Sequence, residues 1–406
     1  MKKVLALVLT LMMTLVATAC GGGNEDTKEQ ETGTVNEIAE DTKTETTNET
    51  GKESVITEGN AAEFKVAIVS SPSGVDDGNF NQDIYSGVLT FIEENPGVTI
   101  TPIREETGDS AAAVQAVADV VADYDVIVCC GFQFAGIGNL ALDNPDTKFI
   151  LIDAWPSVDG VEVTAEQIID NVYAAYYAEQ ESGFYAGVAA ALSTVTGKVA
   201  VVNGIAYPSN VNYQYGFECG VKYANEVHEA NAELVELASY AGTDVTGANV
   251  GGNYVGDFSD AATGKVLGNA LIDAGVDVML VAAGGSGSGV FTAAKEAEGV
   301  LVIGCDVDQY DDGANGESNV VLTSALKKMH DTVYKVLNTV KDGSFAGQNV
   351  ILTAADDATG YVKKAGRCQL SEETIAAVDE AEAQVKAGVI VPAANFNGVT
   401  PESFSW

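Results

Sequence analysis

Short runs of β-branched and other apolar residues alternate with helical stretches along most of this sequence. Runs of this length suit strands that are buried on both faces, and parallel sheets covered by helices produce this alternation. The predicted strands form two sets, at 65–69, 98–103, 126–130 and 149–152, and then at 198–202, 234–239, 278–281 and 301–303. The repeated set predicts two similar α/β halves.

The helical stretches support the same architecture of two doubly wound, parallel-sheet lobes with a cleft between them. We expect an N-lobe over about 64–180 with a C-terminal return after about 324, and a C-lobe over about 197–323. The predicted helices cover 84–95, 110–123, 213–224 and 261–274, with one bridging the halves at 181–196 and one following the second half at 324–341. In such sheets ligands bind outside the carboxyl ends of the strands, so the loops there are candidate sites.

The N-terminus indicates export. Two lysines precede an apolar stretch at 4–16, which is too short to span a bilayer, and small residues lead to Cys20. The pattern resembles a bacterial lipobox, which implies a signal peptide over 1–19 and a lipidated Cys20; the alternative is an ordinary signal peptide with an incidental cysteine. The stretch 21–63 holds 12 acidic and 3 basic residues and few apolar ones, which predicts a disordered acidic tether. We therefore expect a lipid-anchored protein on the extracytoplasmic face of the cell membrane.

The composition narrows the classes of function. The chain has 59 acidic residues against 20 basic ones, and such a negative protein repels nucleic acid. Two histidines are too few for a His-rich metal site, and they make a His-dependent triad improbable. The five later cysteines include no CxxC pair, so they predict buried thiols without a disulfide framework. These features favour binding over catalysis, with no cofactor.

An aromatic residue and an amide follow the first strand of the first half, where Phe80 and Asn81 open a helix after a loop rich in Gly and Pro. A ring offers a stacking face, and an amide both donates and accepts hydrogen bonds, which suits a planar polar ligand. Tyr213 occupies the equivalent place in the second half, so lobe closure would hold a flat ring between Phe80 and Tyr213. The alternative is that Phe80 fills the core and Asn81 caps the helix.

Four further residues are candidates, three of them near predicted strand ends and one early in a predicted helix. Gly284 and Gly285 belong to a glycine-rich loop that fits neither dinucleotide nor P-loop patterns, but its amides can donate to a ligand oxygen. Asp306 ends another strand and can accept from two sugar hydroxyls. Lys327, placed early in the helix predicted at 324–341, supplies a compensating positive charge or is simply a solvated lysine.

Together these segments resemble the basic membrane protein family of bacterial lipoproteins. Its members are substrate-binding proteins of ABC transporters, many of them specific for purine nucleosides. The matching stretches run in order over roughly 64–365 and comprise 66–69, 75–77 with 80–82, 183–192, 216–217 with 220–223, 282–285 with 289–291, 303–304 with 306, 308 and 309, and 322–324 with 326–328.

The resemblance implies a type I periplasmic-binding-protein fold and a set of ligand-binding residues. It implies that Phe80 and Tyr213 hold the base and that Asn81 bonds the base edge. It implies that Asp306 and Lys327 serve the ribose near the backbone of Gly284 and Gly285. It implies that Asp153 is one further ligand-binding residue. Trp155 is an additional aromatic candidate outside the resemblance. The family commonly has Asp where Ser71 stands and Phe where Tyr213 stands.

We therefore predict a lipid-anchored substrate-binding protein of an ABC transporter. It captures a purine nucleoside or a similar small polar ring by lobe closure and presents it to a permease. A lipoprotein that senses a ligand and signals to a membrane receptor is the first alternative. An enzyme that processes nucleosides is the second.

Overall fold

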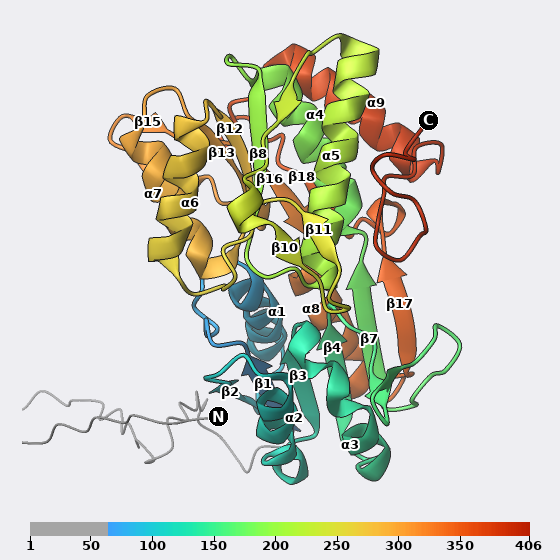
Figure 1. The fold of residues 1–406 in the computed structure, drawn as a ribbon. Coiled ribbons are helices and arrows are strands. Elements are labelled where there is room, and N and C mark those ends of the chain that lie inside the picture. Colours follow the sequence, from blue (N-terminus) through green and yellow to red (C-terminus); the bar gives the residue numbers. More distant parts are fainter. Residues whose placement is uncertain (1–63) are drawn as a thin grey trace, which may run out of the picture. The chain divides into compact units, whose positions relative to one another are not determined.

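Two six-stranded sheets organise the computed structural model, which describes residues 64–406 (Figure 1). The predicted signal peptide, the lipidated Cys20 and the tether lie outside the described residues. All strands of the first sheet are parallel. In spatial order they are β2 (Val98–Arg104), β1 (Phe64–Ser70), β3 (Val126–Cys130), β4 (Lys148–Ile152), β7 (Val172–Tyr177) and β17 (Gln348–Leu352).

The second sheet repeats this arrangement, except that one of its two edge strands is antiparallel. Its spatial order is β9 (Glu233–Leu234), β8 (Lys198–Asn203), β12 (Val278–Ala282), β13 (Leu301–Asp306), β16 (Val321–Lys327) and the antiparallel β18 (Thr359–Tyr361). The predicted class of two doubly wound parallel sheets is therefore confirmed. Short two-stranded ribbons decorate the loops: β5 (Ser157–Val158) with β6 (Val161–Glu162), β10 (Gly242–Thr243) with β11 (Asn249–Gly251), and β14 (Ala314–Asn315) with β15 (Ser318–Asn319).

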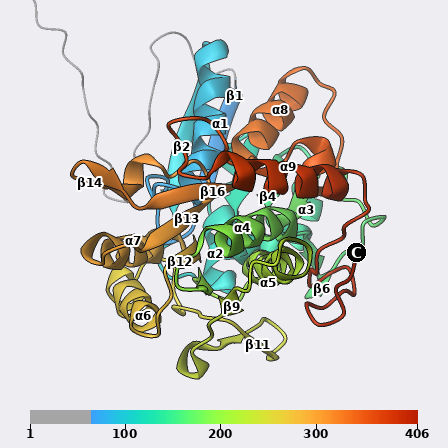
Figure 2. The same cartoon turned by 90° about the horizontal axis from the view of Figure 1, so that it is seen from above.

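Helices cover each sheet on both faces (Figure 2). Around the first sheet lie α1 (Phe80–Glu94) and α8 (Met329–Lys341) on one face, and α2 (Ser110–Ala118) and α3 (Gly138–Asp143) on the other. Around the second lie α4 (Glu179–Ser193), α5 (Pro208–His228) and α9 (Glu372–Lys386) on one face, and α6 (Ala261–Asp273) and α7 (Gly287–Glu296) on the other. Short 3₁₀ turns are η1 (Val121–Asp123), η2 (Phe132–Ile137), η3 (Ala238–Tyr240), η4 (Gly284–Ser286), η5 (Asp311–Gly313) and η6 (Ala354–Asp356).

The chain crosses between the sheets three times. We call residues 64–177 with 329–352 the N-lobe, and residues 179–327 with 359–406 the C-lobe. The crossings are short and are hydrogen-bonded to the strand ends beside them: the Ala178 amide donates to the Leu352 carbonyl at 2.8 Å, and the Lys328 amide donates to the Ala358 carbonyl at 2.9 Å. Such short, linked crossings are suited to act as a hinge.

The segment predicted as one helix over 324–341 is corrected by the structure. Its first residues belong to β16, which lies between β13 and β18 and is buried, and the helix begins only at Met329. Burial on both faces of the sheet outweighs the polar residues that suggested a helix. The expected return to the N-lobe thus begins after Lys328 instead of about residue 324, and the chain then goes back to the C-lobe at β18.

Other elements differ from the expectations in smaller ways. The helix predicted at 181–196 packs into the core of the C-lobe as α4 instead of bridging the halves. The strand predicted at 234–239 is reduced to β9, and β7 and β17 were not predicted. Helix α1 begins at Phe80, where Phe80 and Asn81 were expected to open a helix and four residues before the range 84–95, and Asn79 caps it by accepting from the Phe80 amide at 2.6 Å.

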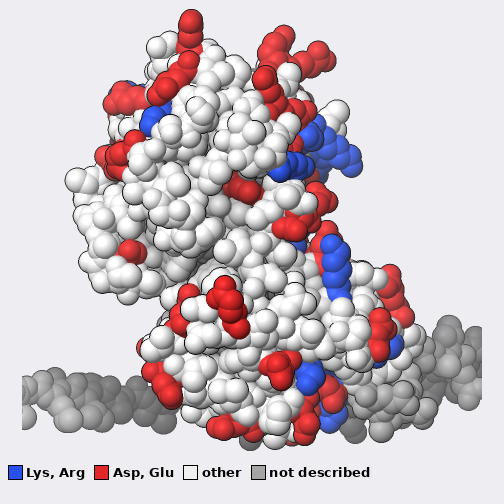
Figure 3. Space-filling model, turned by 90° about the vertical axis from the view of Figure 1, so that its right-hand side faces the viewer, with Lys and Arg blue, Asp and Glu red and all other residues white. Residues whose placement is uncertain are grey.

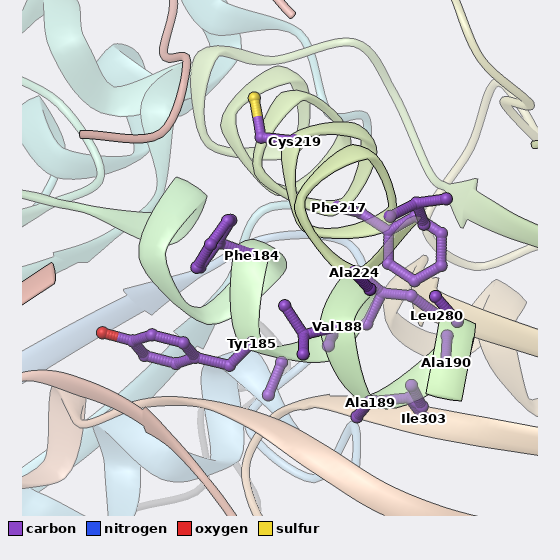
Figure 4. Close-up of a cluster of buried hydrophobic side chains, with 14 of the residues drawn as sticks. Phe184, Tyr185, Val188, Ala189, Ala190, Phe217, Cys219, Ala224, Leu280 and Ile303 are labelled. Carbon is purple, nitrogen blue, oxygen red and sulfur yellow. The ribbon is translucent and has the colours of Figure 1, made fainter. Parts of the chain in front are cut away.

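Four glycines let helices α4 and α5 approach closely in the C-lobe. A Cβ atom added at Gly183 would overlap the Tyr213 carbonyl, and one at Gly220 would overlap the Phe184 carbonyl; Gly187 and Gly216 are similarly confined. Around this contact lie buried side chains including Phe184 and Phe217 (Figure 4). The contact therefore holds α4 against α5, the helix whose N-terminal turns line the cavity described below.

The surface is acidic, as the composition requires. Figure 3 shows Asp and Glu side chains spread over one face, with fewer Lys and Arg. The cysteines at 129, 130, 219 and 305 are buried free thiols, and Cys368 is partly exposed. Within residues 64–406, no helix has the length and apolar character needed to cross a membrane.

Candidate functional site

A cavity of about 650 Å³, including its open mouth, lies where the carboxyl ends of the strands of the two lobes face each other. The N-lobe lines it with Ser71, Ser73, Asp77, Asn79, Phe80, Asn81, Cys130, Gly131, Phe132, Gln133 and Asp153, and the C-lobe with Tyr207, Ser209, Asn210, Tyr213, Phe258, Ala282, Gly284, Cys305, Asp306 and Lys327. The rule for doubly wound sheets predicts this location.

The loop between β1 and α1 supplies one wall of the cavity. Its side chains form a network in which the Asn81 amide nitrogen donates to Asp77 Oδ2 at 2.7 Å and to Ser71 Oγ at 2.9 Å. Asp77 also accepts from backbone amides in the first turn of α1, including the Asn81 amide at 3.0 Å. Asn79, not Asn81, is the helix cap. The alternative role considered for Asn81 is thereby excluded, and its side chain lies in the cavity wall.

Lys327 is the centre of the polar part of the site. It ends β16 beside a crossing, it is 2% exposed, and its ammonium lies 2.7 Å from Asp153 Oδ2, 3.5 Å from Glu179 Oε1 and 3.8 Å from Asp306 Oδ1. Asp153 directly follows β4 of the N-lobe and Asp306 ends β13 of the C-lobe, so this cluster joins the two lobes. The expectation of a solvated lysine is wrong, because β16 carries the side chain into the interior.

Burial and charge set the protonation of this cluster. Burial alone would lower the pKa of Lys327, but the charges of Asp153, Asp306 and Glu179 hold that pKa well above its ordinary value. Burial raises the pKa of Glu179 to about 8, against the opposing charge of Lys327, and also raises the pKa of Asp153. The ammonium is therefore charged at neutral pH, and Glu179 is mostly protonated.

Aromatic rings surround the polar cluster. The Lys327 ammonium lies 4.8 Å from the centre of the Phe80 ring and 6.0 Å from that of Tyr213, so the two rings predicted to face each other share one cavity. Tyr213 is in the second turn of α5 instead of at its start, and its hydroxyl donates to Asp306 Oδ1 at 3.0 Å. The hydroxyl therefore orients the carboxylate that the resemblance assigns to the ribose.

A second aromatic group spans the lobes. Phe132 of the N-lobe contacts Tyr207 of the C-lobe with ring centres 5.4 Å apart, and Tyr207 contacts Phe258 at 5.9 Å. These residues were not among the predicted site residues. Phe132 follows directly after β3, so the strand-end rule would have found it, whereas Phe258 lies in an irregular segment that carries no local signal.

The remaining predicted residues divide between the cavity and its surroundings. Ser71 and Gly284 line the cavity, whereas Gly285 lies behind Gly284 against the Phe258 backbone. Trp155 is outside the lining: its indole nitrogen donates to the Val350 carbonyl at 3.2 Å and its ring packs on Tyr176. Trp155 is therefore removed from the candidates.

The family model Bmp, described as "ABC transporter substrate-binding protein PnrA-like", matches residues 64–395. The chain belongs to the Bmp family. This confirms the resemblance read from the sequence, and it identifies a transport protein that binds a substrate, not an enzyme.

Curated Bmp relatives agree with this assignment. The chain is 29% identical over 333 residues to "ABC transporter nucleoside-binding protein BmpA" of Lactococcus lactis, covering 75% of this chain and 85% of that one. It is 29% identical over 344 residues to the "CD4+ T-cell-stimulating antigen" of Listeria monocytogenes, covering 81% and 87% of the two chains. It is 27% identical over 279 residues to "Basic membrane protein A" of Borreliella burgdorferi, covering 68% and 72%.

Solved structures share the fold of this Bmp chain. A solute-binding protein of an ABC transporter system from Aeropyrum pernix K1 superposes with a TM-score of 0.68 at 23% identity, covering 84% of this chain and 96% of that chain. A second one, from Conexibacter woesei, gives a TM-score of 0.58 at 19% identity, covering 82% and 99%. The predicted periplasmic-binding-protein fold is thereby confirmed.

Proposed function

We propose that this chain is the lipid-anchored, extracytoplasmic substrate-binding protein of an ABC transporter, and that it captures a purine nucleoside by lobe closure for delivery to its permease. The observation that carries the proposal is one inter-lobe cavity that combines aromatic rings with a buried lysine among carboxylates. The name of the Lactococcus lactis relative, a nucleoside-binding protein, supports the same ligand class.

Two regions of the cavity correspond to the two halves of a nucleoside. Phe80 and Tyr213 offer faces for a planar base, and stacking on an aromatic side chain contributes about 1–3 kcal/mol per base. Asp306 and Lys327 offer an acceptor and a donor for sugar hydroxyls. A sugar alone would leave the aromatic wall unused.

Charge argues for an uncharged ligand over a nucleotide. Lys327 is the only Lys or Arg among the described residues that line the cavity, and Asp77, Asp153 and Asp306 line it as well. The lysine is already paired with carboxylates at 2.7 to 3.8 Å. A phosphate would face like charges without a free cation, so we expect the site to reject it.

The position of the Lys327 cluster couples the ligand to closure. Asp153 belongs to the N-lobe, Asp306 belongs to the C-lobe, and Lys327 and Glu179 flank the crossings at 328 and 178. A ligand that bonds to these groups stabilises the arrangement in which the lobes meet. Membrane attachment in this proposal rests on Cys20, which follows the small residues of the export signal.

A thermal-shift panel tests the proposed ligand class. The purified protein is heated with inosine, guanosine or adenosine, with the matching 5′-monophosphates, and with free ribose. A ligand at a hundredfold excess over its Kd stabilises the protein by about 2.7 kcal/mol, and we expect a rise of several degrees in Tm with nucleosides alone. Equal shifts with the monophosphates, or no shift with any nucleoside, would contradict the proposal.

A further inference from the structure

The carboxylate of Asp77 acts only as a hydrogen-bond acceptor at the start of α1. Its Oδ1 accepts from the Asn79 and Gln82 amides at 3.1 and 3.0 Å, and its Oδ2 accepts from the Asn81 amide at 3.0 Å and from Asn81 Nδ2 at 2.7 Å. All of these partners are donors, which requires an acceptor carboxylate. Asp77 thus holds the Asn81 side chain in one orientation.

This orientation leaves Asn81 only one group to offer a ligand. Its Nδ2 carries two protons, and these are directed to Asp77 Oδ2 and to Ser71 Oγ at 2.9 Å. The opposite orientation would bring an amide oxygen against a carboxylate oxygen. Asn81 lines the cavity, so the polar atom available there is Oδ1, an acceptor whose single protein contact is long, at 3.5 Å from the Ser71 amide.

Asp153 adds a second acceptor to the same cavity. Its Oδ2 is paired with Lys327 at 2.7 Å, whereas its Oδ1 is buried and has no hydrogen-bond partner among residues 64–406. Burial raises the pKa of this carboxyl and the nearby Ser209 hydroxyl opposes that rise, but no hydrogen bond of regular geometry joins the hydroxyl to Oδ1. A buried carboxylate oxygen without a partner is costly, and a donor on a ligand would satisfy it.

We propose that Asp77, acting through Asn81, sets this cavity to recognise a ligand edge that carries N–H donors. The inference rests on the proposed nucleoside-binding function and narrows it to purine nucleosides with a protonated N1, those of the inosine and guanosine type. Guanosine presents adjacent N1–H and 2-amino donors to the two acceptors. Asp77 is a positioning residue, because the atom that faces the ligand belongs to Asn81.

The test compares nucleosides that differ in the N1 donor. Calorimetry with the purified protein measures Kd for inosine, for purine riboside, which has a bare N1, lacks the 6-carbonyl and is smaller, and for 1-methylinosine, which keeps the 6-carbonyl, lacks the N1 proton and is larger. A hydrogen bond to a charged or buried acceptor predicts that inosine binds about 10- to 100-fold more tightly than either comparator. Because the comparators bracket inosine in size, steric fit alone cannot produce that order.

The Asp77→Ala variant tests the positioning role. Without the carboxylate the Asn81 amide can turn, so the ratio of Kd values for purine riboside and inosine is expected to fall below about threefold. Asp76→Ala removes a neighbouring exposed carboxylate that makes no hydrogen bond in the described chain, and it should keep the wild-type ratio. Ser71→Ala frees one amide proton and is expected to lower the ratio part of the way.

Each outcome bears on a different claim. Equal binding of inosine and purine riboside by the wild type would overturn the inference while the proposed function stands. An unchanged ratio in Asp77→Ala, or equal weakening of all three ligands, would overturn the role of Asp77. Binding of none of these nucleosides would instead refute the proposed function. If Asp77→Ala does not fold, the wild-type ligand series and Ser71→Ala still decide the inference.

Discussion

Lys327 was predicted to lie on a helix, and the structure gives it a different setting. The sequence analysis named it as a positive charge for the ligand, but placed it on a helix. The structure places it at the end of a buried strand, within 2.7 to 3.8 Å of three carboxylates. Its partners come from three separate elements, and only the folded sheet order brings them together.

Glu179 gives a prediction on pH dependence at this scale. Its pKa is raised from 4.5 to about 8 in the folded protein because of burial, with Lys327, Asp153 and Asn212 around it. Between these values the folded state keeps a proton that the unfolded state has lost, so the free energy of unfolding falls as pH rises. The Glu179→Gln variant is expected to lose less stability than the wild type between about pH 5 and pH 8 in urea titrations.

A matched control is Glu296→Gln, which removes an exposed carboxylate paired with Lys265. It should retain the wild-type pH slope. The account of Glu179 would be wrong if Glu179→Gln and Glu296→Gln showed the same slope.

The site residues that could not be predicted from the sequence are those that do not follow a clear strand or that act through other residues. Phe80, Asn81 and Tyr213 follow strands with clear apolar runs, so their place in a cavity could be predicted. Phe258 lies in a segment with no regular element, and Asp77 acts through a network of hydrogen bonds that spacing does not reveal. The local sequence thus predicts which residues follow the strands of a sheet, but not which irregular segments contribute further residues to the cavity.

At the scale of elements, burial explains both the correct and the incorrect predictions. Strands such as β3 and β12 are wholly buried apolar runs, and their sequences show it. In β16 the sequence mixes Thr, Ser and Lys with apolar residues, so the pattern favoured a helix although the sheet places it beside β13. Pairing with distant strands decided the outcome, and this information is not local.

The contact between α4 and α5 gives a prediction on stability. A Cβ atom at Gly220 would overlap the Phe184 carbonyl, so Gly220→Ala must push the helices apart or strain them. Overpacking of this kind costs about 1–3 kcal/mol in the free energy of unfolding, which chemical denaturation measures. Gly360→Ala is the control, because a Cβ atom there meets nothing within 4 Å. Wild-type stability in Gly220→Ala would contradict the close packing.

At the scale of the whole molecule, overall charge and site charge have separate consequences. The formal charge of −39 makes binding to nucleic-acid polymers unfavourable. It does not exclude their uncharged monomers, because the proposed site is a cavity whose aromatic walls and single paired lysine suit a neutral ring. The three crossings lie beside that cavity, and in the proposed function they are the hinge about which the lobes close on the ligand.

Calorimetric titration of the purified wild-type protein and its Phe80→Ala variant with inosine tests the central claim most directly. The account predicts one binding site per chain in the wild type, and binding weakened by about 10- to 100-fold in Phe80→Ala through the loss of ring stacking. Phe396→Ala, which removes an exposed ring outside the cavity, should bind like the wild type. Absence of binding by the wild type, or equal affinity in Phe80→Ala, would contradict nucleoside capture in this cleft.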